Sequence, residues 1–340
     1  MGISTRQSNI ELLRIISMIM ILMVHFTGAT FPIPSQITIN NFFNINTSTK
    51  VIMESFSIIG VNCFILISGY FGIRPSVKGI VNFILWCSFY SISIYSLYTL
   101  ARPTQYNVQN IIESLAIFSH TDLWFIPAYF SLYIVAPIIN KGTSSLNQKQ
   151  FILLLCGLTF INVYLGWFWG GKVNPTGYNV MQLIYIYIIG RYIKTQAKSI
   201  YHIKCNKYII GYLISLLLIV FSTFICKSSV AFAYNSPFVI LSSVFFFLIF
   251  ASMHFHNTTI NHIASSAFAV YLIHKMPPVW NDLKNILIHN TNGTDPFIFA
   301  IFWILFVALI FTSSITIDKI RELITNPVST KITKLIKRII

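Results

Sequence analysis

Long apolar runs separated by short polar stretches recur along the whole chain. A helix needs about 20 apolar residues to cross the hydrocarbon core of a membrane, and a window of that length finds about ten such runs. The pattern therefore predicts an all-α, polytopic transmembrane helix bundle. The expected spans are 8–29, 51–73, 79–100, 123–140, 150–169, 178–193, 208–226, 236–255, 263–280 and 296–317.

Composition supports lipid as the main solvent of this chain. Apolar residues make up 55% of it and charged residues 9%, with a mean hydropathy of +0.72. A soluble domain carries roughly 25% charged residues, so these 340 residues could not cover a water-facing surface. The five cysteines are scattered without a CxxC motif, and we expect no metal site.

The net charge of +15 comes from basic residues that alternate with the apolar runs. They form no single patch, so we exclude a nucleic-acid partner and expect contact with anionic headgroups of the bilayer. An N-in/C-in topology places most of them in the cytoplasm, as the positive-inside rule requires. We expect one membrane domain over 1–317 and a basic amphipathic tail over 318–340 along the inner leaflet. The basic residues left outside are Lys50, Arg102, Lys172, Lys227, Lys275 and Lys284.

Three ionisable residues, Glu11, Arg14 and His25, lie inside the first apolar run. Such residues cost roughly 2.5–3.5 kcal/mol each at a helix centre on insertion scales, which makes them functional candidates. The spacing from Arg14 to His25 corresponds to about three turns plus 20°, so both should project from one face about 16 Å apart. Glu11, one turn before Arg14, can pair with it at i, i+3.

The helix face that carries Arg14 and His25, called the stripe below, offers an anion-binding group at one end and a base at the other. Arg14 near the cytoplasmic end can bind phosphate in bidentate fashion. A neutral imidazole at His25 can accept a proton from a substrate hydroxyl. A coenzyme A thioester has the matching shape, with phosphates and a long arm that ends in a reactive carbon. On spacing alone, the favoured alternative is that Arg14 reaches the inner headgroups and His25 sits at the outer interface.

Four short motifs occur in a fixed order along nearly the whole chain. They are Arg14-(ten residues)-His25; Gly60-Val61-Asn62-Cys63-Phe64 with Ser68-Gly69-Tyr70-Phe71; Leu123-Trp124-Phe125 with Leu132-Tyr133 and Pro137; and Tyr271-Leu272-Ile273-His274. Each motif is weak alone, and their order makes the set specific. Together they resemble the integral-membrane acyltransferase family of the acyltransferase-3 type, whose members O-acetylate bacterial surface polysaccharides.

The resemblance implies an O-acetyltransferase of the bacterial plasma membrane. Acetyl-CoA would enter from the cytoplasm with Arg14 and Arg74 near its phosphates, and no metal would take part. His25 would be the catalytic base, and the acceptor would be a hydroxyl of a surface polysaccharide or its lipid-linked precursor. The supporting residues would be Glu11, Ser68, Gly69, Trp124, Tyr271 and His274.

Several of these residues have simpler alternatives, and the chain departs from the family pattern in places. Ser68 and Gly69 fit small-residue helix packing equally well, Trp124 fits an interfacial anchor, and packing is favoured for Tyr271 and His274. Many members have Asp at the position of Asn62, so a carboxylate role is absent there. Some have an Arg-x-Arg pair after the second helix, where this chain has Gly72 and Arg74.

Two other function classes also fit a ten-span bundle with buried charges. A transporter or flippase for a glycan or small anion would show two related halves with paired broken helices, and we find no such repeat. A non-catalytic partner of a polysaccharide assembly system could retain the acyltransferase scaffold, and the intact Arg14 and His25 argue against it.

Overall fold

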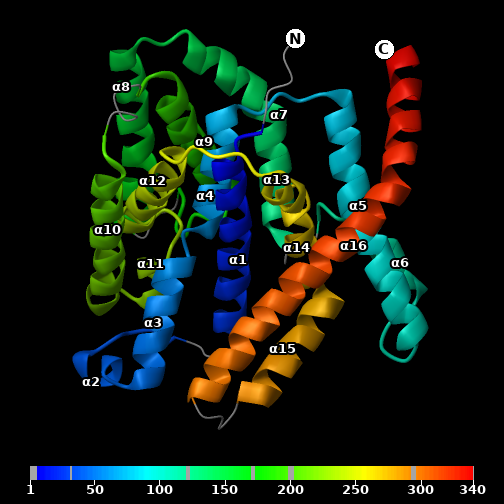
Figure 1. Cartoon of the computed structure of the whole chain (residues 1–340), viewed down its shortest axis with the longest axis horizontal. Coiled ribbons are helices and arrows are strands. Elements are labelled where there is room, and N and C mark those ends of the chain that lie inside the picture. Colours follow the sequence, from blue (N-terminus) through cyan, green and yellow to red (C-terminus); the bar gives the residue numbers. More distant parts are fainter. Residues whose placement is uncertain are drawn as a thin grey trace. The chain divides into compact units, whose positions relative to one another are not determined.

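The computed structural model is helical, with no strand in the part of the chain that it describes (Figure 1). This confirms the predicted all-α class. The helices divide into two compact units, each assembled from two separate stretches of chain. Unit 1 comprises Met1–Ile73 and Ser131–Ala264, and unit 2 comprises Arg74–Phe130 and Ser265–Ile340. The described residues are 6–30, 33–119, 123–169, 173–197, 203–291 and 296–339.

Six helices of the described chain are long and apolar enough to cross a membrane, which supports a multi-pass membrane protein. Two expected spans coincide with shorter helices, α9 (Val180–Thr195, 16 residues) and α12 (Pro237–Ala251, 15 residues). At 1.5 Å per residue they extend over only about 24 Å of a roughly 30 Å core. The count of about ten spans and the N-in/C-in orientation therefore stay predictions. The six spans are Ser8–Ala29, Ile45–Phe71, Val77–Ala101, Gln148–Phe168, Cys205–Ile225 and Ile298–Arg338.

Helix α1 (Ser8–Thr30) packs against α3 (Ile45–Ser57) and α4 (Gly60–Phe71) in unit 1 (Figure 1). Gly60 makes the α1–α4 contact possible, because a Cβ there would lie 2.7 Å from the Ser17 carbonyl oxygen. From that crossing, α4 continues to the Ser8 end of α1.

A second glycine contact joins α4 to α9. A Cβ on Gly190 would lie 2.6 Å from the Leu66 carbonyl oxygen, and Gly69 faces the backbone of Tyr187. The two helix backbones therefore touch, as small residues permit in membrane bundles. The other helices of unit 1 are α2 (Ile39–Phe42), α7 (Phe125–Ser144, from Ser131 on), α8 (Gln148–Thr159), the π-helix Phe160–Phe168, α10 (Cys205–Ile225), α11 (Ser228–Ala231) and α13 (Thr258–Ala264).

Unit 2 is built around α16 (Pro296–Ile339), which packs against α5 (Val77–Ala101) and α14 (Ala267–His274). Residues 318–339, expected as a tail, continue α16 without a break. Asp318 is fully buried and pairs with Arg321 at 2.7 Å. The remaining helices of unit 2 are α6 (Val108–Ser114) and α15 (Pro277–Thr291).

Candidate functional site

Arg14 projects from α1 toward α4 within unit 1. Its Nε lies 3.2 Å from the Oε2 of Glu11, and its guanidinium carbon lies 5.9 Å from the centre of the Phe64 ring. The i, i+3 pair suggested by the sequence is therefore present. Nε makes no hydrogen bond within the described chain, so the contact with Glu11 is an ion pair without an aligned N–H. The guanidinium thus keeps donors for a ligand.

His25 lies on the same helix and is half-buried, as Arg14 is. Their neighbours Leu13, Leu22 and Phe26 are fully buried. Helix α1 runs as an uninterrupted α-helix from Ser8 to Thr30, which is the condition for the predicted stripe. The two side chains are therefore expected about 16 Å apart along the helix axis, on one partly accessible face.

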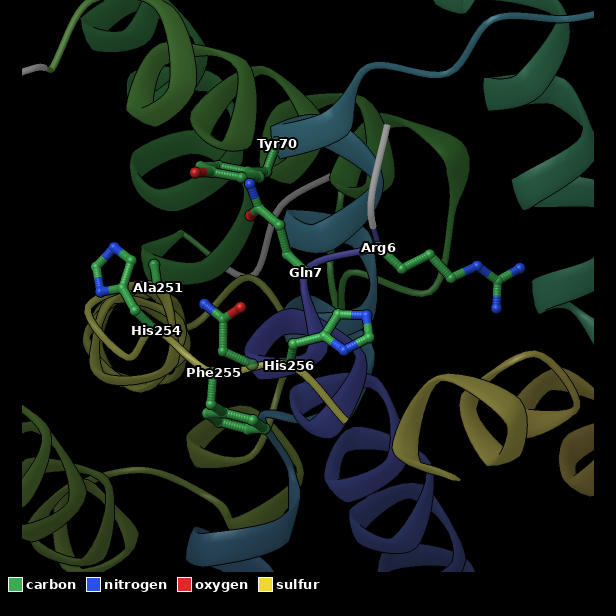
Figure 2. A pocket seen from close by; sticks show the side chains of 8 residues that line it. Arg6, Gln7, Tyr70, Ala251, His254, Phe255 and His256 are labelled. Carbon is green, nitrogen blue, oxygen red and sulfur yellow. The ribbon is translucent and has the colours of Figure 1, made fainter. Parts of the chain in front are cut away.

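A pocket of about 270 Å³ opens at the Ser8 end of α1 (Figure 2). Two hydrogen bonds attach this end of α1 to the end of α12 and the segment after it: Asn9 Nδ2 donates to the Phe250 carbonyl (2.9 Å), and Ser8 Oγ accepts from Asn257 N (2.8 Å). The Arg6 side chain points away from the other labelled side chains and donates to the Asn261 carbonyl. The lining residues are Arg6, Gln7, Asn9, Tyr70, Ala251, His254, Phe255 and His256.

Two further cations of unit 1, Lys194 and Arg191, lie near the end of α4. Lys194 Nζ is 4.5 Å from the centre of the Tyr70 ring and 3.3 Å from its hydroxyl. Arg191 lies over Gly72, since a Cβ there would be 2.6 Å from Nη1. The sequence analysis treated both only as topology signals. Their i, i+3 spacing at the end of an apolar helix was the available clue.

The turn after α4 is held by a closed set of hydrogen bonds. Tyr187 accepts a hydrogen bond from Ile73 N (2.8 Å) and donates one to Asn140 Oδ1 (2.7 Å). Asn140 Nδ2 donates in turn to the Ile73 carbonyl (2.8 Å). Gly72 within this turn has a positive φ of 74°, which favours glycine. The backbone of the turn beside Arg191 is therefore held in one conformation by these hydrogen bonds.

A buried polar network occupies another part of unit 1. Asn62 and Gln182 both donate to the Tyr234 carbonyl, at 3.0 and 2.8 Å. Asn62 is fully buried, and an aspartate there would place a carboxylate, which only accepts hydrogen bonds, against the Tyr234 carbonyl oxygen, which also only accepts. This explains why an amide fits where many relatives of the predicted family carry a carboxylate.

The remaining predicted residues fall into both units. In unit 1, Gly69 lies at the α4–α9 contact, and the half-buried Ser68 donates to the Phe64 carbonyl at 3.2 Å. In unit 2, Arg74 is exposed.

An aromatic cluster of unit 2 brings together the other three predicted residues. The rings of Trp124 and Phe125 lie 5.8 Å apart, and Phe125 is 5.7 Å from Tyr271. Tyr271 in turn contacts the ring of His274 at 6.1 Å. His274 is fully buried, with Nδ1 2.5 Å from the Val270 carbonyl oxygen. These contacts fit the packing alternative, and a role in ligand contact stays a prediction.

Comparison with protein families decides the class of the chain. A family model described as an acyltransferase domain matches residues 7–317. The chain belongs to the acyltransferase-3 family. The match covers both units and confirms the family that the four motifs indicated. No curated protein and no solved structure matches the chain. Within the part of this acyltransferase-3 chain that the structure describes, no group of three His, Cys, Asp or Glu residues could hold a metal ion.

Proposed function

We propose that this membrane acyltransferase is an O-acetyltransferase of the bacterial plasma membrane. It transfers the acetyl group of cytoplasmic acetyl-CoA to a hydroxyl of a cell-surface polysaccharide or its lipid-linked precursor. The observation that supports this best is the pair of ionisable residues on α1 of an acyltransferase-3 chain. Arg14 is turned inward to Phe64, and His25 lies on the same helix.

The reaction requires one proton to be moved and returned. The His25 imidazole takes the proton of the acceptor hydroxyl, and the resulting oxygen attacks the thioester carbonyl carbon. The new C–O bond forms as the C–S bond breaks. The imidazolium then returns the proton to the departing thiolate, so the enzyme ends in its starting state.

The cations at the Ser8 end of α1 fit the phosphates of the donor. Arg14 retains donors that its ion pair with Glu11 does not use, and a guanidinium binds phosphate with two parallel hydrogen bonds. The positive-inside rule places this end in the cytoplasm, where acetyl-CoA would enter. The thioester would then lie further along α1, toward His25.

The test is the acetyl content of the surface polymer in cells that make the His25→Ala variant at normal levels. Loss of a general base typically lowers the rate by about 10²–10⁴-fold, so acetylation should fall below detection by mass spectrometry. The matched control is His289→Ala, an exposed histidine of α15 in unit 2. Normal acetylation in the His25 variant would remove this residue from the mechanism.

A second measurement separates the enzyme from a transporter with the same spans. The purified chain is given acetyl-CoA and a polysaccharide acceptor, and free thiol is followed with time. An acetyltransferase releases coenzyme A in step with O-acetyl formation. A transporter or an assembly partner releases none.

A further inference from the structure

The Arg191 guanidinium of unit 1 is only partly satisfied. The residue is half-buried, and its Nε is inaccessible to solvent. Within the described residues this Nε has no hydrogen-bond partner. A guanidinium carries five N–H donors, and a partly buried charge without a partner is unfavourable. Arg191 therefore has unused binding capacity at a defined position.

Stabilisation of the end of α4 does not account for this side chain. A cation near a helix C-terminus can donate to the last carbonyl groups. Nη1 of Arg191 lies close to the Cβ position of Gly72, directly after α4, yet the buried Nε has no hydrogen-bond partner among the described residues. The turn is held instead by Tyr187 and Asn140. Arg191 can therefore be removed without breaking those hydrogen bonds.

Lys194 adds a second cation one helical turn along α9. Residues at i and i+3 share a helix face, so Lys194 and Arg191 lie side by side. The Lys194 ammonium donates one hydrogen bond, to the Tyr70 hydroxyl, and two of its three N–H groups remain for another acceptor. Tyr70 also lines the 270 Å³ pocket, which connects this pair of cations to that pocket.

Unit 1 contains no carboxylate that could neutralise this pair. The sequence of its two stretches holds only Glu11 and Glu54. Glu11 is paired with Arg14. Glu54 lies on α3, before the start of α4, whereas Tyr70 and Gly72 lie at the other end of α4. The anion that Arg191 and Lys194 are suited to bind must come from outside the unit.

We propose that Arg191 and Lys194 form a phosphate-binding site beside the Tyr70 pocket, which holds a phosphate group of the acyl donor. The planar guanidinium and the ammonium match a phosphate ester in charge and hydrogen-bond donors. The aromatic rings of Tyr70 and Phe255 give the adjoining pocket apolar faces. This inference rests on the proposed function. It adds two α9 residues to a donor site that the sequence placed on α1 and at Arg74.

The test is equilibrium binding of coenzyme A to the full-length protein in detergent, with wild type, Arg191→Gln and Lys194→Gln compared. Loss of a hydrogen bond to a charged group corresponds to roughly tenfold or more in affinity, and Arg191→Gln should show it. Arg191→Lys should retain part of the affinity. The matched control is Lys149→Gln, an exposed lysine at the start of α8 in the same unit, which should bind as wild type does.

Two comparisons identify the phosphate source and separate this inference from the proposed function. Arg191→Gln should weaken coenzyme A binding but leave binding to phosphatidylglycerol vesicles unchanged. The reverse result assigns the site to a lipid headgroup and overturns the inference. Equal coenzyme A affinity in wild type and Arg191→Gln, at equal thermal unfolding midpoints, also overturns it. Acetyl transfer by wild type, measured separately, tests the proposed function whatever the variant binds.

Discussion

The two units differ in how their charged residues are paired. Unit 2 contains six of the eight acidic residues, and its buried Asp318 accepts hydrogen bonds from Trp86 (3.0 Å), Tyr90 (2.8 Å) and Arg321 (2.7 Å). Unit 1 contains only two acidic residues, and Arg191 has no anionic partner among the described residues.

This difference separates structural charges from functional ones. A buried pair whose donors and acceptors are satisfied contributes to a defined fold, and removing one partner is costly. A cation whose donors are unused adds little to the fold and remains available for a ligand. Variants of unit 2 charges should therefore change stability, and variants of unit 1 charges should change binding and turnover.

The largest effect is expected at the buried network of unit 2. Asp318→Asn leaves Arg321, which is 7% exposed, with only the longer contact to Glu322 (3.9 Å), and should cost about 3–5 kcal/mol of unfolding free energy. Denaturation of the purified protein in detergent measures it. The double variant Asp318→Leu/Arg321→Met removes both charges and should recover much of the loss. A stable Asp318→Asn protein would contradict the structural role of this pair.

Arg14→Gln should produce the opposite pattern in unit 1. The substitution removes the charge that we propose to bind a phosphate of the donor, and it should lower coenzyme A affinity roughly tenfold to a hundredfold. The thermal unfolding midpoint should change little, since Arg14 is 30% exposed and its single ion pair is poorly aligned. If stability fell as it does in Asp318→Asn while affinity stayed constant, the distinction between the units would fail.

Gly190→Ala tests whether the α4–α9 contact positions the cations of unit 1. The added Cβ would lie 2.6 Å from the Leu66 carbonyl oxygen, so the helices must separate, at about 1–3 kcal/mol. Coenzyme A affinity should fall with it, because Arg191 and Lys194 move with α9. Gly157→Ala in α8 is the matched control, since its Cβ would meet nothing within 4 Å. That variant should be as stable as wild type or slightly more stable.

The smallest effect concerns an exposed ion pair of unit 2. Arg102 donates two hydrogen bonds to Asp282 (2.8 and 2.9 Å), and these bonds lower the pKa of that carboxyl group. A carboxyl with a lowered folded-state pKa stabilises above its unfolded value of about 4, and this contribution is lost as the pH falls through the folded-state value. Unfolding midpoints of wild type and Asp282→Asn should therefore differ at pH 6, and the difference should shrink as the pH falls through the folded-state pKa of Asp282. A constant difference would assign the effect to packing.

Local patterns in the chain were sufficient for the helical class and for the bounds of α1. Hydropathy windows placed the first span at 8–29, and the structure has α1 at Ser8–Thr30. The Glu11–Arg14 pair followed from helical spacing alone, because both partners lie on one helix. Hydropathy did not show that α9 and α12 are short, since an apolar run can continue beyond the end of a helix.

The sequence by itself determined the solvent, the fold class, the family and the Glu11–Arg14 pair on α1, because each depends on composition or on patterns along the chain, whereas the functional stripe of Arg14 and His25 stays a prediction. Only the tertiary structure showed that α9 carries Arg191 and Lys194 to the end of α4. That contact depends on the closeness of Gly69 and Gly190, more than a hundred residues apart in the sequence. A glycine's capacity to admit another backbone becomes visible only when the opposing helix is present. The sequence could therefore show that Arg191 and Lys194 share a helix face, but not that this face lies beside Tyr70 and Gly72.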